Sequence, residues 1–309
     1  MTKARRGIYA AAVSPFNTDG SINAHKSVAY CKYLLSDGGC DGVAPTGTTG
    51  EGTSIPMTSR LALPAAFAEA GIESDRVIFG TGSPSAGDCV ALTKAALEAG
   101  YNNVLVLPPF YYKNPSDDGV FSYYANLVDK VGDDRLRIYL YHFPQMSQVP
   151  FSTDLVKRLV AEFGPVIAGL KDSSGDFEQS RGFVEATGGV DADFDVYPSS
   201  ESMLWDGLSI GTAGIISGST NAFGAKAQAA LQAPEGPLRD AAMEAVAAAR
   251  TMAAKYPLMS AMKTIEAWRT GDDQWMRMAP PLLPLNEEQK AALKADIEAL
   301  EATPMAASA

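Results

Sequence analysis

Residues 137–172 read RIYLYHFPQMSQVPFSTDLVKRLVAEFGPVIAGLKD. The stretch begins and ends with short runs rich in Ile, Val and Tyr, Arg137–Pro144 and Val166–Asp172, and a helical segment, Thr153–Glu162, lies between them. Successive positions of both runs are apolar, as expected for strands whose two faces are covered in a parallel sheet. A strand, a helix and a second parallel strand form a right-handed crossover unit. The stretch therefore predicts one such unit.

The same alternation extends in both directions through most of the chain. Eight strand-like runs lie at Gly7–Phe16, Gly42–Pro45, Val77–Gly82, Asn103–Pro108, Arg137–Pro144, Val166–Asp172, Phe194–Ser199 and Gly211–Ser217. Helical segments separate most of these runs, among them His25–Ser36, Thr58–Ala70, Asp88–Ala99, Gly119–Val131 and Glu178–Thr187. Eight strand–helix units predict an α/β fold closed into a (β/α)8 TIM barrel. A doubly wound open sheet is the alternative, and the lack of G-x-G-x-x-G after the first run disfavours it.

The alternation of strands and helices ends after Ser217. Helical segments follow one another at Lys226–Gln232, Pro237–Tyr256, Leu258–Thr270 and Glu287–Glu301, with several prolines between them. We expect one of these helices to close the barrel and the others to form a C-terminal helical appendix. The predicted division is a barrel over residues 1–225 and a helical domain over residues 226–309. The tail Ala302–Ala309 has no pattern and is expected to fray.

Charge and hydropathy exclude several classes of partner. The chain has 36 acidic and 25 basic residues, a formal net charge of −11, which disfavours binding to nucleic acid or to an anionic membrane surface. No run of about 18 apolar residues is present, so no membrane-spanning helix is expected. The apolar run Gly7–Val13 follows basic residues, as in a signal peptide, but fits a first buried strand better. A small anionic ligand stays possible because a site can be locally positive.

The cysteines and histidines indicate the compartment of the protein and whether it binds a metal. The cysteines are Cys31, Cys40 and Cys89, an odd number without a C-x-x-C pair, which favours a reducing compartment and predicts a cytoplasmic protein. The histidines are His25 and His142, so no metal site is expected.

The sixth strand ends in Lys171, at the end of a barrel where function gathers. The lysine follows an apolar run and should point into the barrel mouth. One interpretation is a lysine whose head reaches water at a strand end. The other is a Schiff-base lysine, because desolvation favours the neutral amine, which attacks a carbonyl carbon.

The fifth strand ends in Tyr141-His142. Alternation along a strand places Tyr139 and Tyr141 on one face and His142 on the other. The neighbouring strand would then bring Tyr141 beside Lys171, where a phenol can relay protons. The alternative is a core tyrosine with a satisfied hydroxyl. His142 is expected to be buried and hydrogen-bonded rather than a ligand.

Two loops at other strand ends contain residues that indicate a function less specifically than Lys171 and Tyr141 do. The sequence GTTGE at residues 47–51 frees backbone N–H groups that could hold an anion, and Glu51 is expected to cap or pair with a neighbour. The aromatic run at Phe110, Tyr111 and Tyr112 suggests an interface or a lid, or else local packing under the loop.

These motifs, GTTGE at 47–51, Tyr111-Tyr112 with Pro115, Tyr141-x-x-Pro144 and GLKD at 169–172, stand in an order and spacing that resemble one family. The chain resembles the dihydrodipicolinate synthase / N-acetylneuraminate lyase family over roughly residues 6–300. The resemblance implies a class I lyase in which Lys171 forms an imine with the ketone of a 2-oxo acid. It implies Tyr141 as the general acid and base. No cofactor is implied beyond the covalent imine.

The resemblance also implies the rest of the site. Thr49, with the N–H groups of Thr48 and Thr49, would clamp the carboxylate of pyruvate, and the Thr48 hydroxyl would link a proton relay. Tyr112 would complete that relay from a neighbouring subunit, since family members are commonly homotetramers. Gly214 and Ile216 match the last strand that walls the pocket.

One position departs from the family pattern. Met146 stands where dihydrodipicolinate synthases have an arginine for the carboxylate of aspartate semialdehyde, and a methionine cannot supply that cation. Ser173, two residues after the lysine, is typical of aldolases for hydroxylated 2-oxo acids. Ser199 and the serines after it would add polar contacts, or would cap the next helix.

The main hypothesis is therefore a lyase that cleaves, forms or dehydrates a 2-oxo-3-deoxy sugar acid, with pyruvate as product or donor. The alternatives are a dihydrodipicolinate synthase that condenses pyruvate with aspartate semialdehyde, and a non-catalytic relative that binds 2-oxo acids.

Overall fold

A computed structural model describes residues 3–302, and it contains the eight predicted strands. They are β1 (Gly7–Ala10), β2 (Gly42–Val43), β3 (Phe79–Gly80), β4 (Asn103–Val106), β5 (Arg137–His142), β6 (Ile167–Asp172), β7 (Asp195–Pro198) and β8 (Gly214–Ser217). Each strand lies within a run that the sequence indicated. All their pairings are parallel, which confirms the α/β class.

The strands close into a ring. One ladder has the order β2-β1-β8 and the other the order β3-β4-β5-β6-β7. Hydrogen bonds join the two ladders at both ends: the Ile78 N–H donates to the Val43 carbonyl at 3.0 Å, and the Ala213 N–H donates to the Val196 carbonyl at 2.9 Å. The predicted TIM barrel is therefore confirmed.

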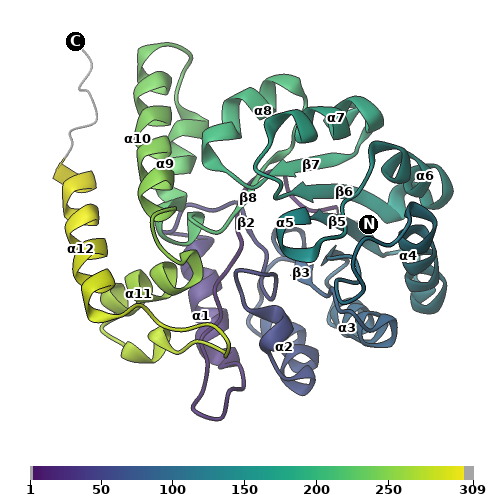
Figure 1. The fold of residues 1–309 in the computed structure, drawn as a ribbon, viewed down its shortest axis with the longest axis horizontal. Coiled ribbons are helices and arrows are strands. Elements are labelled where there is room, and N and C mark those ends of the chain that lie inside the picture. The colour runs from purple at the N-terminus through teal and green to yellow at the C-terminus, as the bar shows by residue number, and fades with distance from the viewer. Residues whose placement is uncertain (1–2, 303–309) are drawn as a thin grey trace.

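Helices surround this ring and cover its outer face (Figure 1). They are α1 (Ala24–Leu34), α2 (Met57–Glu69), α3 (Ala86–Glu98), α4 (Asp117–Val131), α6 (Thr153–Phe163), α7 (Phe177–Thr187), α8 (Leu204–Ile210) and α9 (Thr220–Gln232). A single-turn helix, α5 (Pro144–Ser147), follows β5. The appendix comprises α10 (Pro237–Ala253), α11 (Leu258–Thr270) and α12 (Glu287–Ala302), gathered on one side of the barrel.

Local sequence signals fix where several of these helices begin. The side chains of Asn23, Ser85, Ser116 and Ser152 each accept a hydrogen bond from a backbone N–H in the first turn of the helix that follows. Such caps satisfy N–H groups that have no partner within the helix. Pro144 ends the predicted fifth strand early because it occupies the first position of α5.

Two predicted boundaries, the end of β1 and the start of α9, were wrong by six residues each, and Asn221 explains both. The Asn221 side chain donates to the Ala11 carbonyl at 2.8 Å and accepts from the Val13 N–H at 3.0 Å, so β1 ends at Ala10 instead of Phe16. The same bonds hold α9 from Thr220, six residues before the predicted start, despite the low helix propensity of asparagine and glycine. The predicted division at residue 225 falls inside α9 and stays a prediction.

Tyrosines close the N-terminal end of the barrel. Tyr9, Tyr139 and Tyr197 are buried inside the ring, with ring centroids 5.7 Å apart for Tyr9 and Tyr197 and 6.1 Å apart for Tyr139 and Tyr197. The hydroxyls of Tyr9 and Tyr197 donate to the carbonyl of Arg5, which precedes β1. This floor leaves the opposite end of the barrel as the place for a site.

Three further observations concern the described part of the chain. Between residues 3 and 302, no helix has both the length and the apolar character that a bilayer crossing requires. Cys31, Cys40 and Cys89 are free and buried. Ala302 ends α12, and the remainder of the tail that was expected to fray lies outside the described residues.

Candidate active site

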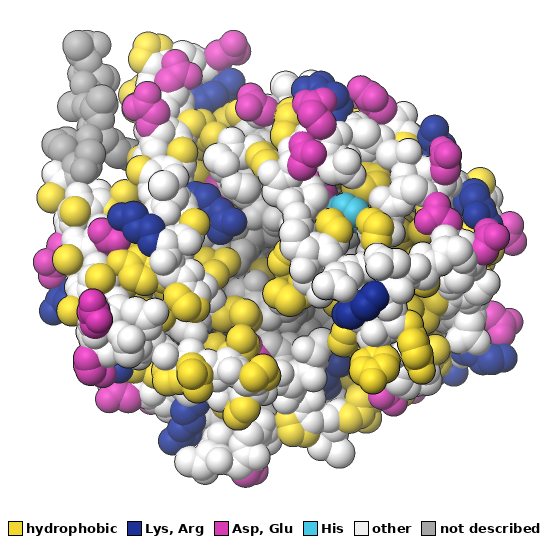
Figure 2. All heavy atoms as spheres, in the orientation of Figure 1, with side chains coloured by type: hydrophobic (Ala, Val, Ile, Leu, Met, Phe, Trp, Pro, Cys, Tyr) yellow, Lys and Arg dark blue, Asp and Glu magenta, His cyan; other side chains and the backbone are white. Residues whose placement is uncertain are grey.

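A cavity of about 500 Å³ lies at the C-terminal ends of the strands. Figure 2 shows a hollow near the centre of the face that it presents, beside the C-terminal helices. Seven of the nine predicted site residues line the cavity: Thr48, Thr49, Tyr141, Lys171, Ser173, Ser199 and Ile216. The volume is in the range of small-molecule sites.

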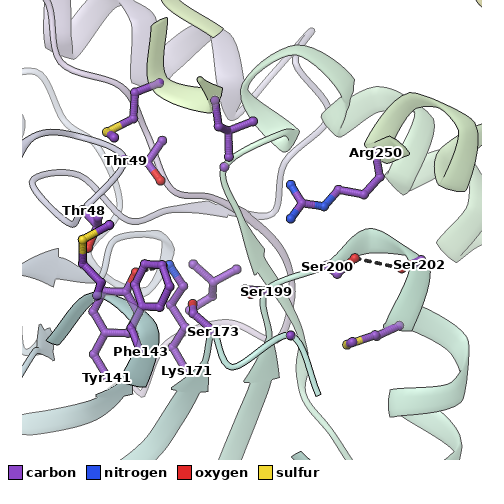
Figure 3. A pocket seen from close by; sticks show the side chains of 17 residues that line it. Thr48, Thr49, Tyr141, Phe143, Lys171, Ser173, Ser199, Ser200, Ser202 and Arg250 are labelled. Carbon is purple, nitrogen blue, oxygen red and sulfur yellow. Dashed lines mark hydrogen bonds between the residues drawn. The ribbon is translucent and has the colours of Figure 1, made fainter. Parts of the chain in front are cut away.

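Lys171 and Tyr141 are neighbours across two strands. The register of β5 and β6 pairs Tyr141 with Lys171. The Lys171 amine donates to the Tyr141 hydroxyl oxygen at 3.3 Å and lies 4.4 Å from the centroid of the Tyr141 ring (Figure 3). Only 3% of Lys171 is exposed, and it has no ion-pair partner in the part of the chain that the structure describes. An amine held against an aromatic ring and away from carboxylates can attack a carbonyl carbon.

Apolar and aromatic side chains surround this pair. Phe143 stacks on Tyr141 with ring centroids 5.9 Å apart, and both line the cavity. Ile216 of β8 is fully buried and also lines the cavity. Such a wall excludes water and strengthens every electrostatic interaction at the amine.

Close backbone contacts constrain the loop that carries Thr48 and Thr49. Thr46 has a positive φ of 58° and its hydroxyl donates to the Gly80 carbonyl at 2.9 Å. A side chain at Gly52 would place its Cβ only 1.9 Å from the Thr46 carbonyl oxygen, so this turn requires glycine. The loop therefore presents its two threonines to the cavity in a fixed arrangement.

Glu51 of the same loop pairs with Lys263 from α11. Its Oε1 lies 2.7 Å from the Lys263 Nζ, and its Oε2 accepts from the Ala279 N–H at 2.7 Å. Burial lowers the pKa of Lys263, and Glu51 opposes that shift. The pairing expected for Glu51 is thus confirmed, and it connects the threonine loop to the appendix.

His142 and Asp172 support the strand ends from outside the cavity. The His142 Nδ1 accepts from the Phe151 N–H at 3.1 Å, and burial lowers the pKa of this imidazole. Asp172 accepts from the Ser174 N–H at 2.9 Å and from the Ser180 hydroxyl at 2.6 Å. His142 is buried and hydrogen-bonded, as the sequence predicted.

The serines after β7 face the cavity. Ser199, Ser200 and Ser202 line it, and the hydroxyls of Ser200 and Ser202 lie 2.8 Å apart. No side chain caps α8 or the short turn before it, so the alternative of a capping cluster is not what the structure contains. Glu201, between these serines, is buried and accepts from the Ser219 hydroxyl at 2.7 Å.

Two predicted site residues lie outside the cavity. Tyr112 is 79% exposed and packs edge-to-face on Tyr111, with ring centroids 5.3 Å apart. Gly214 begins β8 at the opposite end of the barrel, where a Cβ would lie 1.9 Å from the Gly7 carbonyl oxygen. The wall from the last strand is therefore Ile216 with Gly218, not Gly214.

The sequence did not indicate several lining residues from the appendix, above all Arg250. Arg250 reaches from α10 toward the cavity, on the side away from Tyr141 and Lys171 (Figure 3). Leu258 and Met259 come from α11. Among residues 3–302, no group of three or more His, Cys, Asp and Glu side chains is placed to hold a metal ion.

Comparisons with known proteins agree with this geometry. The family model described as "Dihydrodipicolinate synthetase family" matches residues 4–300. An uncharacterized DapA-like lyase of Chloroflexus aurantiacus is 35% identical over 300 residues, covering 96% of this chain and 97% of that one. The 4-hydroxy-tetrahydrodipicolinate synthase of Bacillus subtilis is 28% identical, covering 94% and 97%.

A solved structure shares the whole architecture. The crystal structure of dihydrodipicolinate synthase from Agrobacterium tumefaciens superposes with a TM-score of 0.82 at 31% identity, covering 96% of this chain and 99% of that one. The resemblance deduced from the motifs is therefore confirmed. The chain belongs to the dihydrodipicolinate synthetase family and is a pyruvate-dependent lyase of the Schiff-base-forming class.

Proposed function

We propose that this lyase cleaves, forms or dehydrates a 2-oxo-3-deoxy sugar acid, with pyruvate as the product or donor in the aldol reaction. The observation that carries the proposal is the Lys171 amine, buried in the cavity wall, 3.3 Å from the Tyr141 hydroxyl. Hydroxyl-bearing residues and an exposed Met146 line the space in front of it.

The first step joins substrate and enzyme. The Lys171 amine attacks the C2 ketone, and the resulting carbinolamine loses water to give an iminium ion. Thr49 and the N–H groups of Thr48 and Thr49 hold the C1 carboxylate during this step. Tyr141 moves the protons that the carbinolamine gains and loses.

The second step breaks a bond to carbon 3. For aldol cleavage, Tyr141, a phenolate once it has given its proton to the departing water, takes the proton of the C4 hydroxyl through the Thr48 hydroxyl. The C3–C4 electrons then enter the iminium, and an aldehyde leaves. The enamine takes a proton at C3, and water releases pyruvate from Lys171. For dehydration, the Tyr141 phenolate takes a C3 proton to give the enamine and returns it to the C4 hydroxyl, which departs as water. The iminium supplies the electron sink in both reactions, so we propose no further cofactor.

Met146 and the serines support the sugar-acid substrate. Met146, 53% exposed, occupies the position at which a synthase would hold the carboxylate of aspartate semialdehyde with an arginine. Ser173 and Ser199 offer hydroxyls to a polyhydroxylated chain.

Dihydrodipicolinate synthesis is the second candidate because Arg250 brings another cation to the cavity. A coupled assay with pyruvate and aspartate semialdehyde separates the two: turnover favours the synthase, and its absence with turnover of a sugar acid favours the main proposal.

Borohydride trapping tests the covalent step. The wild-type protein with pyruvate and borohydride should gain the mass of one reduced pyruvate, while Lys171→Ala should gain none. Lys157→Ala, at an exposed position of α6, is the matched control and should behave as wild type. No mass gain in the wild type, or an equal gain in Lys171→Ala, would overturn the proposal. Trapping without exchange of the pyruvate methyl protons would instead indicate a relative that only binds 2-oxo acids.

We further propose a cytoplasmic homotetramer. The three free, buried cysteines suit a reducing compartment. The exposed rings of Tyr111 and Tyr112 suit a contact between subunits, in which Tyr112 would complete the relay of a neighbouring site.

A further inference from the structure

The charge of the cavity differs from the charge of the whole chain. The chain has a net charge of −11, yet the described residues that line the cavity include two cations, Lys171 and Arg250, and no carboxylate. Lys171 is committed to the ketone in the proposed reaction. Arg250 is therefore a second cation, on the side of the cavity away from the imine, without a role in that chemistry (Figure 3).

Ser219 and Glu201, which do not line the cavity, hold the Arg250 side chain in place. Its Nη1 donates to the Ser219 hydroxyl oxygen at 3.3 Å, and its Nε lies 4.0 Å from the Glu201 Oε2. The Ser219 hydroxyl in turn donates to the Glu201 Oε1 at 2.7 Å. Because Glu201 is only 2% exposed, it compensates the charge of Arg250 from within the protein and does not enter the cavity.

The free edge of the guanidinium faces the cavity. Arg250 is 29% exposed, and its Nη2 forms no hydrogen bond or ion pair with any residue between 3 and 302. A guanidinium presents a planar fork of N–H donors that fits a carboxylate or a phosphate with two parallel hydrogen bonds. The hydroxyls of Ser200 and Ser202, also in the cavity wall, can add donors beside it.

From this arrangement we infer that Arg250 binds a second negatively charged group at the end of the substrate remote from its ketone. The substrate is then a dianionic 2-oxo acid, with C1 held at Thr48 and Thr49 and a carboxylate or phosphate at Arg250. This inference rests on the proposed function and narrows it, since it excludes sugar acids with a neutral far end as preferred substrates. Arg250 is thereby a specificity-determining residue.

Imine trapping with simple 2-oxo acids tests the inference without requiring turnover. 2-Oxoadipate and 2-oxohexanoate have the same chain length and differ in the charge of the far end. We expect the wild type to be half-trapped at an about tenfold lower concentration of 2-oxoadipate than of 2-oxohexanoate, as a charge-assisted bidentate contact allows. 2-Oxoglutarate is one carbon shorter than 2-oxoadipate. Comparing the concentrations at which the two acids are half-trapped shows which chain length reaches Arg250.

Three variants test whether Arg250 causes the preference for 2-oxoadipate over 2-oxohexanoate. Arg250→Met should remove it, and Arg250→Lys should keep part of it, because lysine retains the charge without the fork. Arg158→Met removes an exposed arginine that pairs with Asp118 and does not line the cavity. It controls for the loss of one positive charge and should keep the full preference.

The outcomes separate the two proposals. Equal trapping of both acids by the wild type, or an unchanged preference in Arg250→Met, would overturn the role of Arg250 while leaving the lysine chemistry intact. Failure of the wild type to trap pyruvate would instead overturn the proposed function. Sugar acids with a terminal carboxylate and with a terminal phosphate, compared by kcat/KM, then identify which anion Arg250 receives.

Discussion

Glu51 and Lys263 form a fully buried ion pair that joins the threonine loop of the barrel to helix α11. Neither side chain is exposed, and the atoms that pair are 2.7 Å apart. The Lys263 amine also lies 4.4 Å from the centroid of the Phe16 ring. The geometry of the threonine loop therefore depends on a helix more than 200 residues away in sequence.

Breaking the Glu51–Lys263 ion pair should destabilise the fold. Lys263→Met leaves the Glu51 carboxylate buried without its cation, and we expect the free energy of unfolding to fall by about 3–5 kcal/mol. The double variant Glu51→Gln/Lys263→Met should lose less, because no unpaired charge is left and glutamine still accepts from the Ala279 N–H. Urea unfolding followed by circular dichroism measures both.

An exposed pair provides the control. Lys290→Met breaks the pair with Glu287 on α12, and its cost should stay below about 1 kcal/mol. A double variant as unstable as Lys263→Met would show that packing, and not the unpaired charge, accounts for the loss.

Tyr141→Phe should separate the two halves of the proposed reaction. The variant keeps the ring beside Lys171 and loses only the hydroxyl, so it should still form the trapped imine with pyruvate. Turnover should fall by about 10²–10⁴-fold, the usual contribution of a positioned acid and base. The measurement pairs borohydride trapping with steady-state kinetics.

Tyr139→Phe is the matched control for that experiment. Tyr139 lies two residues earlier on β5, and its hydroxyl donates to Asp195 at 3.3 Å in the barrel floor. Its loss should lower stability and leave turnover near the wild-type rate. Normal turnover in Tyr141→Phe would remove Tyr141 from its proposed role.

Much of the site was predictable because local patterns determine it. Alternation along β5 and adjacency of β5 and β6 are enough to place Tyr141 beside Lys171, and the structure pairs these two residues in register. Thr49 and Ser173 also follow strand ends and line the cavity, but the family resemblance, and not a local pattern, assigned them to the site.

Arg250 could not be predicted, since no local pattern distinguishes it. It lies in an alanine-rich helix, and the face that α10 turns toward the barrel mouth depends on packing between distant segments. The early start of α9 escaped prediction for the same reason, because tertiary hydrogen bonds of Asn221 outweigh local propensity there.

Tyr112 provides a test of the proposed assembly. If its exposed ring completes a neighbouring site, Tyr112→Phe should lower kcat and preserve the oligomer. Replacing both Tyr111 and Tyr112 by alanine should shift the sedimentation coefficient to a smaller species, because the contact loses its apolar rings. Leu283→Ala, at a residue that is 76% exposed, is the control and should change neither property. A wild-type protein that sediments as a monomer would contradict the proposal.

The stability of the fold should fall as the pH drops through the range in which histidine titrates. Burial lowers the pKa of His142 below its ordinary value, and Asp172 opposes that shift. In the unfolded chain the imidazole gains a proton near pH 6.5, while the buried imidazole stays neutral. The unfolded state then binds more protons, so acidification stabilises it relative to the fold, until the pH passes below the depressed pKa.

We therefore expect a lower free energy of unfolding at about pH 5.5 than at about pH 7.5, a range that carboxylates and lysines do not span with ordinary pKa values. His142→Gln should reduce this difference, although it also weakens the contact with the Phe151 N–H. His25→Gln replaces the exposed imidazole of α1 and should keep the wild-type difference. If the difference survives in His142→Gln and disappears in His25→Gln, burial of His142 is not its cause.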